Sequence, residues 1–370
     1  MDSLQEEKSL KNPELDISAP QICFFIPSYI YEEIIKNGNE QQKTAALRSL
    51  ATSARLRGMR HVITQMPGMF ISTGNNKRRT IFDAHNRPEL PGTDVLRSEE
   101  SQPSADISAN EAYDYSGITY DFYKETLGRN SIDNHGLRLD STVHFRELAT
   151  EPFENAFWLG NNMVYGDGNP QTSNRFTIDL TITGHEMSHG VVEYEGGLDY
   201  VKDTGAMNEH YADVFGMTIK QYHLKQSAET SNWLIGEGLW TPNINGKALR
   251  SMKEPGTAYD DPLIGKDLQP AHMKDYMDIL FDHGGVHINS GILNKAFYLT
   301  AIYMGGNAWE APAHIWYSSL VNLPNNPSKT TFKDLANTTF VEAGKIYGSN
   351  SKEQKAVYKA MDEVGLTPNK

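Results

Sequence analysis

The sequence is poor in cysteine, in long apolar runs and in positive charge. Cys23 is the single cysteine among 370 residues, so an intrachain disulfide is excluded and stability must come from a core and any bound metal. No run of about 18 apolar residues occurs, which excludes a helix that spans a membrane. The 34 Lys and Arg against 47 Asp and Glu leave a net charge of −13, which argues against nucleic acid as a partner.

The N-terminus also lacks the features of a standard secretory signal. Residues 1–20 are polar and largely acidic, without the basic start and apolar centre that such a signal needs. The apolar run from Ile22 to Ile30 is internal, short and interrupted by Pro27. We therefore expect a protein that either stays in the cytoplasm or is secreted by an unconventional route.

One motif carries metal chemistry, His185-Glu186-x-x-His189. Residues four apart lie on the same face of a helix, so the two imidazoles can meet one ion. A catalytic zinc takes three protein ligands and keeps one position open for water. Glu209 is the natural third ligand, and Asp213, one turn later, can support the site from behind. The pattern predicts a zinc site with Glu186 beside it as an acid–base group.

These motifs resemble those of the thermolysin-like neutral metallopeptidases, and further blocks follow in the family's order. They are Asn155-Ala156-Phe157-Trp158, residues 163–168, Leu249-Arg250-Ser251-Met252 and residues 284–291. The resemblance implies an α+β, two-domain (gluzincin) fold, with a β-rich N-terminal half, an all-helical C-terminal half and the active-site cleft between them. We expect a small helical prodomain over 1–60, a β-rich subdomain with the zinc helix over 77–200 and a helical subdomain over 201–370.

The resemblance also implies roles for other residues. Glu186 would move the proton of the attacking water. His287, oriented by Asp282, and Tyr200 would stabilise the oxyanion. Contacts to the backbone of a peptide or protein substrate fall to Asn155, the main chain of Ala156, and Arg250.

A set of apolar residues aligns with the pocket for the side chain after the scissile bond: Ile182, Ile235, Leu239 and Leu249. We therefore predict a zinc endopeptidase, made as a zymogen, that cleaves before bulky hydrophobic residues. The alternative is a catalytically inert, zinc-stabilised module that binds peptides or proteins in the same cleft.

The chain departs from the family at the calcium positions. These carry Thr181, Lys220, Asn232 and Leu234, with Glu237 retained, and Lys247 at a second site. Calcium needs six to eight oxygen ligands, and an ammonium group cannot supply one. Lys220 can instead pair with Glu237, so we expect little or no calcium dependence.

The stretch Pro27-Ser28-Tyr29-Ile30 resembles the short prodomain of protealysin-like precursors. It implies an intramolecular inhibitor that is removed by autolysis somewhere in residues 50–77. The charges over residues 43–79 are all basic, which fits either this processing region or a solvated face.

Cys23 has two interpretations. A thiolate is a good zinc ligand and could cap the metal in the precursor. Its apolar neighbours Ile22, Phe24 and Phe25 favour the other interpretation, a buried core cysteine.

Periodicity and turn residues predict the secondary structure. Helices are expected over 30–54, 109–127, 177–194, 206–224, 290–304, 311–320, 331–347 and 352–364. Short strands are expected over 81–84, 143–145, 156–158 and 163–165.

Overall fold

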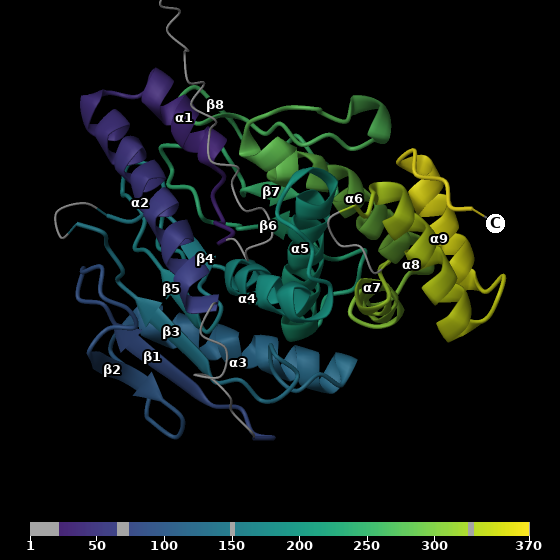
Figure 1. Ribbon diagram of the computed structural model, residues 1–370, viewed down its shortest axis with the longest axis horizontal. Coiled ribbons are helices and arrows are strands. Elements are labelled where there is room, and N and C mark those ends of the chain that lie inside the picture. Colours follow the sequence, from purple (N-terminus) through teal and green to yellow (C-terminus); the bar gives the residue numbers. More distant parts are fainter. Residues whose placement is uncertain (1–21, 65–73, 149–151, 325–328, 370) are drawn as a thin grey trace, which may run out of the picture.

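The computed structural model describes residues 22–64, 74–148, 152–324 and 329–369. A sheet-bearing part and a helical part lie at opposite ends of the molecule, with helices α4 and α5 between them (Figure 1). This arrangement confirms the predicted two-part α+β fold. Within the described residues, no helix is both long enough and apolar enough to cross a membrane.

The main sheet has five strands in the order β2-β1-β3-β5-β4. Its central pairs, β1 with β3 and β3 with β5, are parallel, and the two edge pairs are antiparallel. The strands are β1 Arg79–Asp83, β2 Asp94–Ser98, β3 Leu139–Val143, β4 Ala156–Trp158 and β5 Asn162–Tyr165. The strand predicted at 143–145 is wrong, because His144 has a φ of 57° and turns the chain directly after β3.

The helices of the main body follow their local signals. They are α3 Ile107–Leu127, α4 Leu180–Glu195, α5 Lys202–Leu224, α6 Asp282–Met304, α7 Ala311–Val321, α8 Phe332–Tyr347 and α9 Lys352–Glu363. The side chains of Asp106 and Asp179 cap the first turns of α3 and α4, and Thr331 opens α8 with a capping box. Each of these helices was expected within a few residues of its observed ends, except α6.

Helix α6 begins eight residues earlier than predicted, through a left-handed turn. Asp282, His283, Gly284 and Gly285 have φ values of 53°, 51°, 87° and 84°, so the regular helix starts only after them. Glycine adopts such a backbone at no steric cost, whereas Asp282 and His283 do so under strain. The turn fixes the position of the side chains that follow it.

The helical half is interrupted between α5 and α6. Residues 225–281 are mostly loops, with the strand pairs β6 Leu234–Ile235 with β7 Arg250–Ser251 and β8 Asp260–Asp261 with β9 Gly265–Lys266, and a 3-10 turn, η1 Met273–Asp275. The expectation of a purely helical C-terminal half is therefore wrong in this segment, whose strands are too short to give an alternating pattern.

The leading segment, residues 22–64, begins with an extended stretch over 22–27 and continues as α1 Ser28–Asn37 and α2 Glu40–Thr64. A single helix over 30–54 was expected, but Gly38 and Asn39 end α1 and let α2 start anew. These two helices pack against each other and are drawn in purple in Figure 1. The predicted processing region 50–77 includes residues 65–73, and the predicted prodomain includes residues 1–21; both stretches lie outside the described residues.

Several basic residues of region 43–79 pair with acidic residues rather than facing only solvent. Arg55 pairs with Glu147 of the main body, and Lys77 Nζ lies 2.6 Å from Asp121 Oδ2. The interpretation of this run as a purely solvated face is therefore wrong at these positions.

Candidate active site

The site forms where α4 and α5 cross at close range. A Cβ at Gly184 would lie 3.1 Å from the Cα of Gly216, and a Cβ at Gly216 would lie 2.9 Å from the carbonyl oxygen of Thr181. Only glycine allows this approach, which sets the ligands of one helix against those of the other. Both helices are buried almost all round because they lie between the sheet and the C-terminal helices.

Three predicted metal ligands converge here, and we call them the metal centre: His185, His189 and Glu209. The Nε2 atoms of the two imidazoles are 3.0 Å apart, and each lies 3.5 Å from one carboxylate oxygen of Glu209. All three side chains are buried. Burial alone raises the pKa of Glu209, but His287 and the two imidazoles lower it to about 2.

The residues of the metal centre fit a cation. His189 Nδ1 is 2.8 Å from Asn208 Oδ1, and His185 Nδ1 is 2.8 Å from Asp213 Oδ1, so each Nδ1 hydrogen faces an oxygen. Both Nε2 atoms then carry lone pairs that point at each other, and Glu209 Oε2 is buried with no hydrogen-bond partner among the described residues. Two imidazoles and a carboxylate are the ligand set of a catalytic zinc site.

Asp213 lies behind the metal centre and joins it to the helical half. Its carboxylate accepts two hydrogen bonds of 2.8 Å from the fork of Arg250 and a third of 2.8 Å from Asn294 Nδ2. Burial alone raises the pKa of Asp213, but Arg250 and His185 hold it well below its ordinary value. The carboxylate therefore stays ionised and fixes the imidazole of His185.

Glu186 lies beside the two histidines and does not point away from the cleft. Its ligand atoms and those of His185 and His189 lie within 4.8 Å of one another, and its side chain is fully buried. Glu186 Oε2 accepts a hydrogen bond of 3.2 Å from the main-chain N–H of Trp158, at the end of β4. The edge strand thus orients this carboxylate.

The left-handed turn at the start of α6 positions His287, whose Nε2 lies 3.4 Å from Glu209 Oε1. Asp282 accepts from the main-chain N–H of His287 at 2.9 Å and lies 2.7 Å from its Nδ1. Burial alone lowers the pKa of His287, but Glu209 and Asp282 outweigh it and raise the pKa above its ordinary value. The hydroxyl of Tyr200 donates to Glu209 and lies 3.1 Å from His287 Nε2.

The predicted peptide-binding residues hold the leading segment in this structure. Phe25 N–H donates to the carbonyl of Ala156 at 3.2 Å, and Arg250 Nη1 donates to the carbonyl of Phe25 at 3.5 Å. Asn155 accepts from Ile26 N–H at 2.9 Å and donates to its carbonyl at 3.1 Å. Every main-chain polar group of these two residues is therefore paired with a residue that the sequence had singled out.

The side chain of Phe25 is fully buried in an apolar pocket. A Cβ at Gly236 would lie 3.0 Å from its ring, the guanidinium of Arg250 lies 5.1 Å from the ring centroid, and His185 packs edge-on at 5.4 Å. The predicted pocket residues belong to the same buried cluster: Ile182, Ile235, Leu239 and Leu249. The residues that follow, Pro27, Tyr29 and Ile30, start α1; Tyr29 packs edge-on against Phe281 at 6.3 Å.

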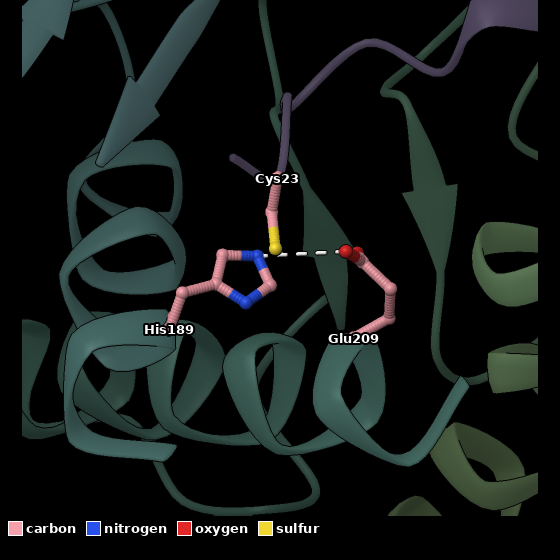
Figure 2. A group of neighbouring side chains, drawn as sticks. All are labelled: Cys23, His189 and Glu209. Atoms are coloured by element: carbon pink, nitrogen blue, oxygen red, sulfur yellow. Dashed lines mark ion pairs between the residues drawn. The ribbon is translucent and has the colours of Figure 1, made fainter. Parts of the chain in front are cut away.

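Cys23 is buried among apolar side chains, as the interpretation favoured from the sequence expected, but its cluster is separate from the main hydrophobic core. Its sulfur belongs to a group with His189 and Glu209 whose ligand atoms lie within 4.8 Å of one another. Figure 2 shows the thiol pointing down between the imidazole and the carboxylate. Its nearest apolar cluster is small and consists of Tyr200 and Val286.

At the predicted calcium position, the ammonium group of Lys220 lies between two carboxylates. Lys220 Nζ lies 3.0 Å from Glu237, as expected, and 2.7 Å from Asp179, which the sequence had not indicated. Asn232 donates to Glu237 at 2.8 Å, Thr181 Oγ1 accepts from Gly236 N–H, and Leu234 of β6 pairs with Ser251 of β7. Lys247 is exposed.

Sequence reasoning missed some residues that build the site. Asn208, which orients His189, directly precedes Glu209 in the sequence but was not predicted to have a role. Phe24, Phe25 and Ile26 were recognised only as an apolar run, although such a run in a polar segment without helical periodicity is typical of a chain buried in a groove. Asn294 carries no local signal.

Comparison with known proteins agrees with this geometry. The family models described as "Thermolysin metallopeptidase, catalytic domain" and "Thermolysin metallopeptidase, alpha-helical domain" match residues 53–193 and 196–366. An extracellular metalloprotease of Pectobacterium carotovorum is 43% identical over 93% of this chain and 96% of its own length. Protease PrtS of a Photorhabdus strain is 41% identical over 92% of this chain and 91% of its own length.

A solved structure is also similar. The precursor of protealysin, a metalloproteinase from Serratia proteamaculans, superposes with a TM-score of 0.83 at 44% identity, covering 93% of this chain and 99% of its own.

Proposed function

The chain belongs to the thermolysin family of zinc metalloendopeptidases, in its protealysin-like group, and from this premise we propose that it is a zymogen that cleaves peptides before bulky hydrophobic residues. One observation carries the proposal. Residues 25 and 26 of the leading segment are hydrogen-bonded by the same groups that the resemblance assigns to a substrate backbone.

The specificity follows from the side chain in the pocket. Phe25 is a large apolar side chain that is completely removed from water. Its burial is worth roughly 1.5–3 kcal/mol relative to an exposed position. A charged side chain would have to lose its hydration without a partner, so we expect Leu, Ile or Phe after the scissile bond.

The chemistry divides among the buried groups of the site. Zinc bound by His185, His189 and Glu209 would polarise the substrate carbonyl and lower the pKa of water to about 7. Glu186 accepts the proton of the attacking water and passes it to the leaving nitrogen, a role that contributes about 10²–10⁴-fold to the rate. Trp158 keeps the carboxylate of Glu186 aimed at the cleft.

His287 and Tyr200 act on the carbonyl oxygen. As negative charge develops there, each N–H or O–H donor stabilises it by about 3–4 kcal/mol. Asp282 accepts from the main-chain N–H of His287 and contacts its Nδ1, and so sets the direction of the Nε2–H bond. Tyr200 must leave Glu209, to which its hydroxyl now donates, before it can serve a substrate.

The leading segment is the inhibitor in this proposal. It covers the cleft with its extended stretch and is anchored by α1 and α2, and it is removed by autolysis within residues 50–77. We assign residues 1–60 to this prodomain, 77–200 to the subdomain with the zinc helix and 201–370 to the helical subdomain. The cation needed near the start of α4 is supplied by Lys220 between Asp179 and Glu237, so calcium has no structural role.

The proposal is tested with the matured enzyme and a quenched-peptide library. We expect hydrolysis before Leu, Ile or Phe, complete loss of activity with 1,10-phenanthroline, recovery with zinc, and no activity in Glu186→Ala. A preference for a charged residue after the scissile bond would overturn the specificity. Zinc binding without any hydrolysis would favour an inert peptide-binding module.

A further inference from the structure

The leading segment presents one of its own peptide bonds to the catalytic groups. The carbonyl oxygen of Phe24 lies 3.3 Å from His287 Nε2, the proposed oxyanion donor. The next side chain, Phe25, fills the pocket for the residue after the scissile bond, and its N–H and carbonyl are held by Ala156 and Arg250. The Phe24–Phe25 bond therefore occupies the register of a bond to be cut.

Chain direction supports this register. Moving from residue 24 to residue 26, the contacts pass from His287 through Ala156 and Arg250 to Asn155, without a gap. A segment that ran backwards would present its carbonyl and N–H groups in the wrong order to these fixed partners. The leading segment thus occupies the cleft in the way a substrate does.

The other reactant in hydrolysis is water, and the sulfur of Cys23 lies beside the residues that would hold the metal that activates it. It lies with His189 and Glu209 in a group of ligand atoms within 4.8 Å of one another (Figure 2). A second observation points to a cation at the metal centre. The buried oxygen Glu209 Oε2 has no hydrogen-bond partner among the described residues. Thiolate, imidazole and carboxylate are all ordinary zinc ligands.

We propose that the Cys23 thiolate is the fourth ligand of the metal held by the metal centre and thereby keeps the Phe24–Phe25 bond intact. This inference rests on the proposed function of the site. On ligation the thiol gives its proton to solvent, and its sulfur takes the one coordination position that catalytic zinc leaves open to water. The leading segment is then bound like a substrate, but the water that would cut it is excluded from the metal.

Arg57 of α2 favours the anionic sulfur. Its guanidinium lies 5.2 Å from the ring centroid of Phe24, and the residue lines a small hollow with Tyr200, Asp282 and His287. Burial lowers the pKa of Arg57, and the attraction between its guanidinium and an anionic Cys23 opposes that shift. Helix α2 therefore contributes a positive charge, and the extended stretch contributes the thiolate that this charge stabilises.

Removal of the thiol changes the outcome in a defined way. One water molecule adds across the amide, the C–N bond between Phe24 and Phe25 breaks, Phe24 gains a carboxylate and Phe25 gains an amine. Glu186 carries the proton from the water to that amine. The products are two fragments whose summed mass exceeds the intact chain by one water.

The first experiment measures metal ligation without any turnover. The full chain with Glu186→Gln is prepared with and without Cys23→Ser, loaded with cobalt(II) in place of zinc, and examined by absorption spectroscopy. We expect a sulfur-to-cobalt charge-transfer band that disappears in the Cys23→Ser double variant. Absence of the band in the parent overturns the proposal, whether or not the protein is a peptidase.

The second experiment measures the peptide bond. The zinc-loaded full chain and its Cys23→Ser and Cys23→Ala forms are followed by intact mass spectrometry. Both substitutions should release a product that begins at Phe25, and at least a tenfold faster hydrolysis of a quenched peptide should accompany it, while the parent stays uncut at this bond. Adding Glu186→Gln to Cys23→Ser should abolish the cut.

The two experiments separate the possible failures. A cobalt band together with an uncut Phe24–Phe25 bond in both cysteine variants overturns the substrate register and the protective role of the thiol. If the matured enzyme hydrolyses no peptide at all, the proposed function has failed, and the band alone then decides the ligation.

Discussion

The metal centre and the leading segment that crosses it are held in different ways. Asp213 satisfies His185, Arg250 and Asn294 through buried, charge-assisted contacts that all arise within the main body. The leading segment instead uses main-chain hydrogen bonds and apolar side chains, with Phe25 as the central one. The first arrangement is a fixed network, while the second consists of contacts that any extended peptide with a suitable side chain can replace.

This difference explains how a site can be complete and inhibited at once. Within the described residues, the contacts of Asp213 that orient His185 come from the main body, and Arg250 makes one further hydrogen bond, to the carbonyl of Phe25. Removing the segment therefore leaves the orienting carboxylates in place. The predictions below test this contrast, from the largest expected effect to the smallest.

The largest expected effect is the loss of catalysis when Glu186 is replaced. Glu186→Gln keeps the shape of the side chain but removes the proton acceptor, so kcat of the matured enzyme should fall by about 10²–10⁴-fold. Because Glu186 accepts its hydrogen bond from Trp158 of the main body, and the amide of glutamine can still accept it, the leading segment should remain docked in the full chain. Glu193→Gln, on the same helix, is the control and should keep its activity. Equal losses in the two variants would contradict the assignment.

The next effect concerns the charged clamp near the start of α4. Lys220→Met leaves Asp179 and Glu237 facing each other without a cation, which should lower the free energy of unfolding by about 2–4 kcal/mol. Chemical denaturation measures this change, with Lys247→Met, at an exposed position, as the control. A chelator selective for calcium should leave the melting temperature of the parent unchanged, and a drop of many degrees would disprove the clamp.

Asn155→Ala tests whether the leading segment and a substrate peptide are bound by the same side chain. The asparagine makes two hydrogen bonds to the main chain of Ile26, so its loss should lower kcat/KM for peptides by about 10–100-fold and also weaken the latency of the precursor. Peptide hydrolysis by matured enzyme and by full-length chain gives both numbers. Asn162→Ala, which removes a buried amide bonded to Thr142, controls for general destabilisation. A change in only one of the two activities would separate the two binding modes.

The smallest effect lies in the main body, at His144, which directly follows β3. Hydrogen bonds that the imidazole of His144 donates to Asp167 and Asp106 raise its pKa to about 9, although burial opposes the shift. Because the folded pKa exceeds the unfolded value of about 6.5, this stabilisation is complete below pH 6.5 and is lost as the pH rises through 9. Discounted for solvent screening at this partly exposed side chain, the loss is about 1–2 kcal/mol.

The measurement is the free energy of unfolding between pH 6 and pH 10. His144→Gln should remove the decrease that the parent shows over this range. A variant with the same pH dependence as the parent would show that His144 does not cause it.

The fold could be predicted where the signal was local. Helix α4 was expected over 177–194 and spans Leu180–Glu195, because its cap and its turn residues are neighbours in sequence. The strand placed at 143–145 and the single helix over 30–54 were wrong, since the first depends on pairing with β1 and the second on a break at Gly38. Short strands in residues 225–281 were missed for the same reason, as their partners decide them.

The sequence by itself determined the metal centre's composition and its position in the chain, because helical spacing brings His185 and His189 to one face without help from other segments. Tertiary structure alone decided that the sulfur of Cys23, more than 160 positions away, lies beside those ligands, and that the Phe24–Phe25 bond meets His287. The physical reason is that contacts between distant segments depend on how apolar faces pack. No local pattern specifies the register in which an extended stretch enters a groove.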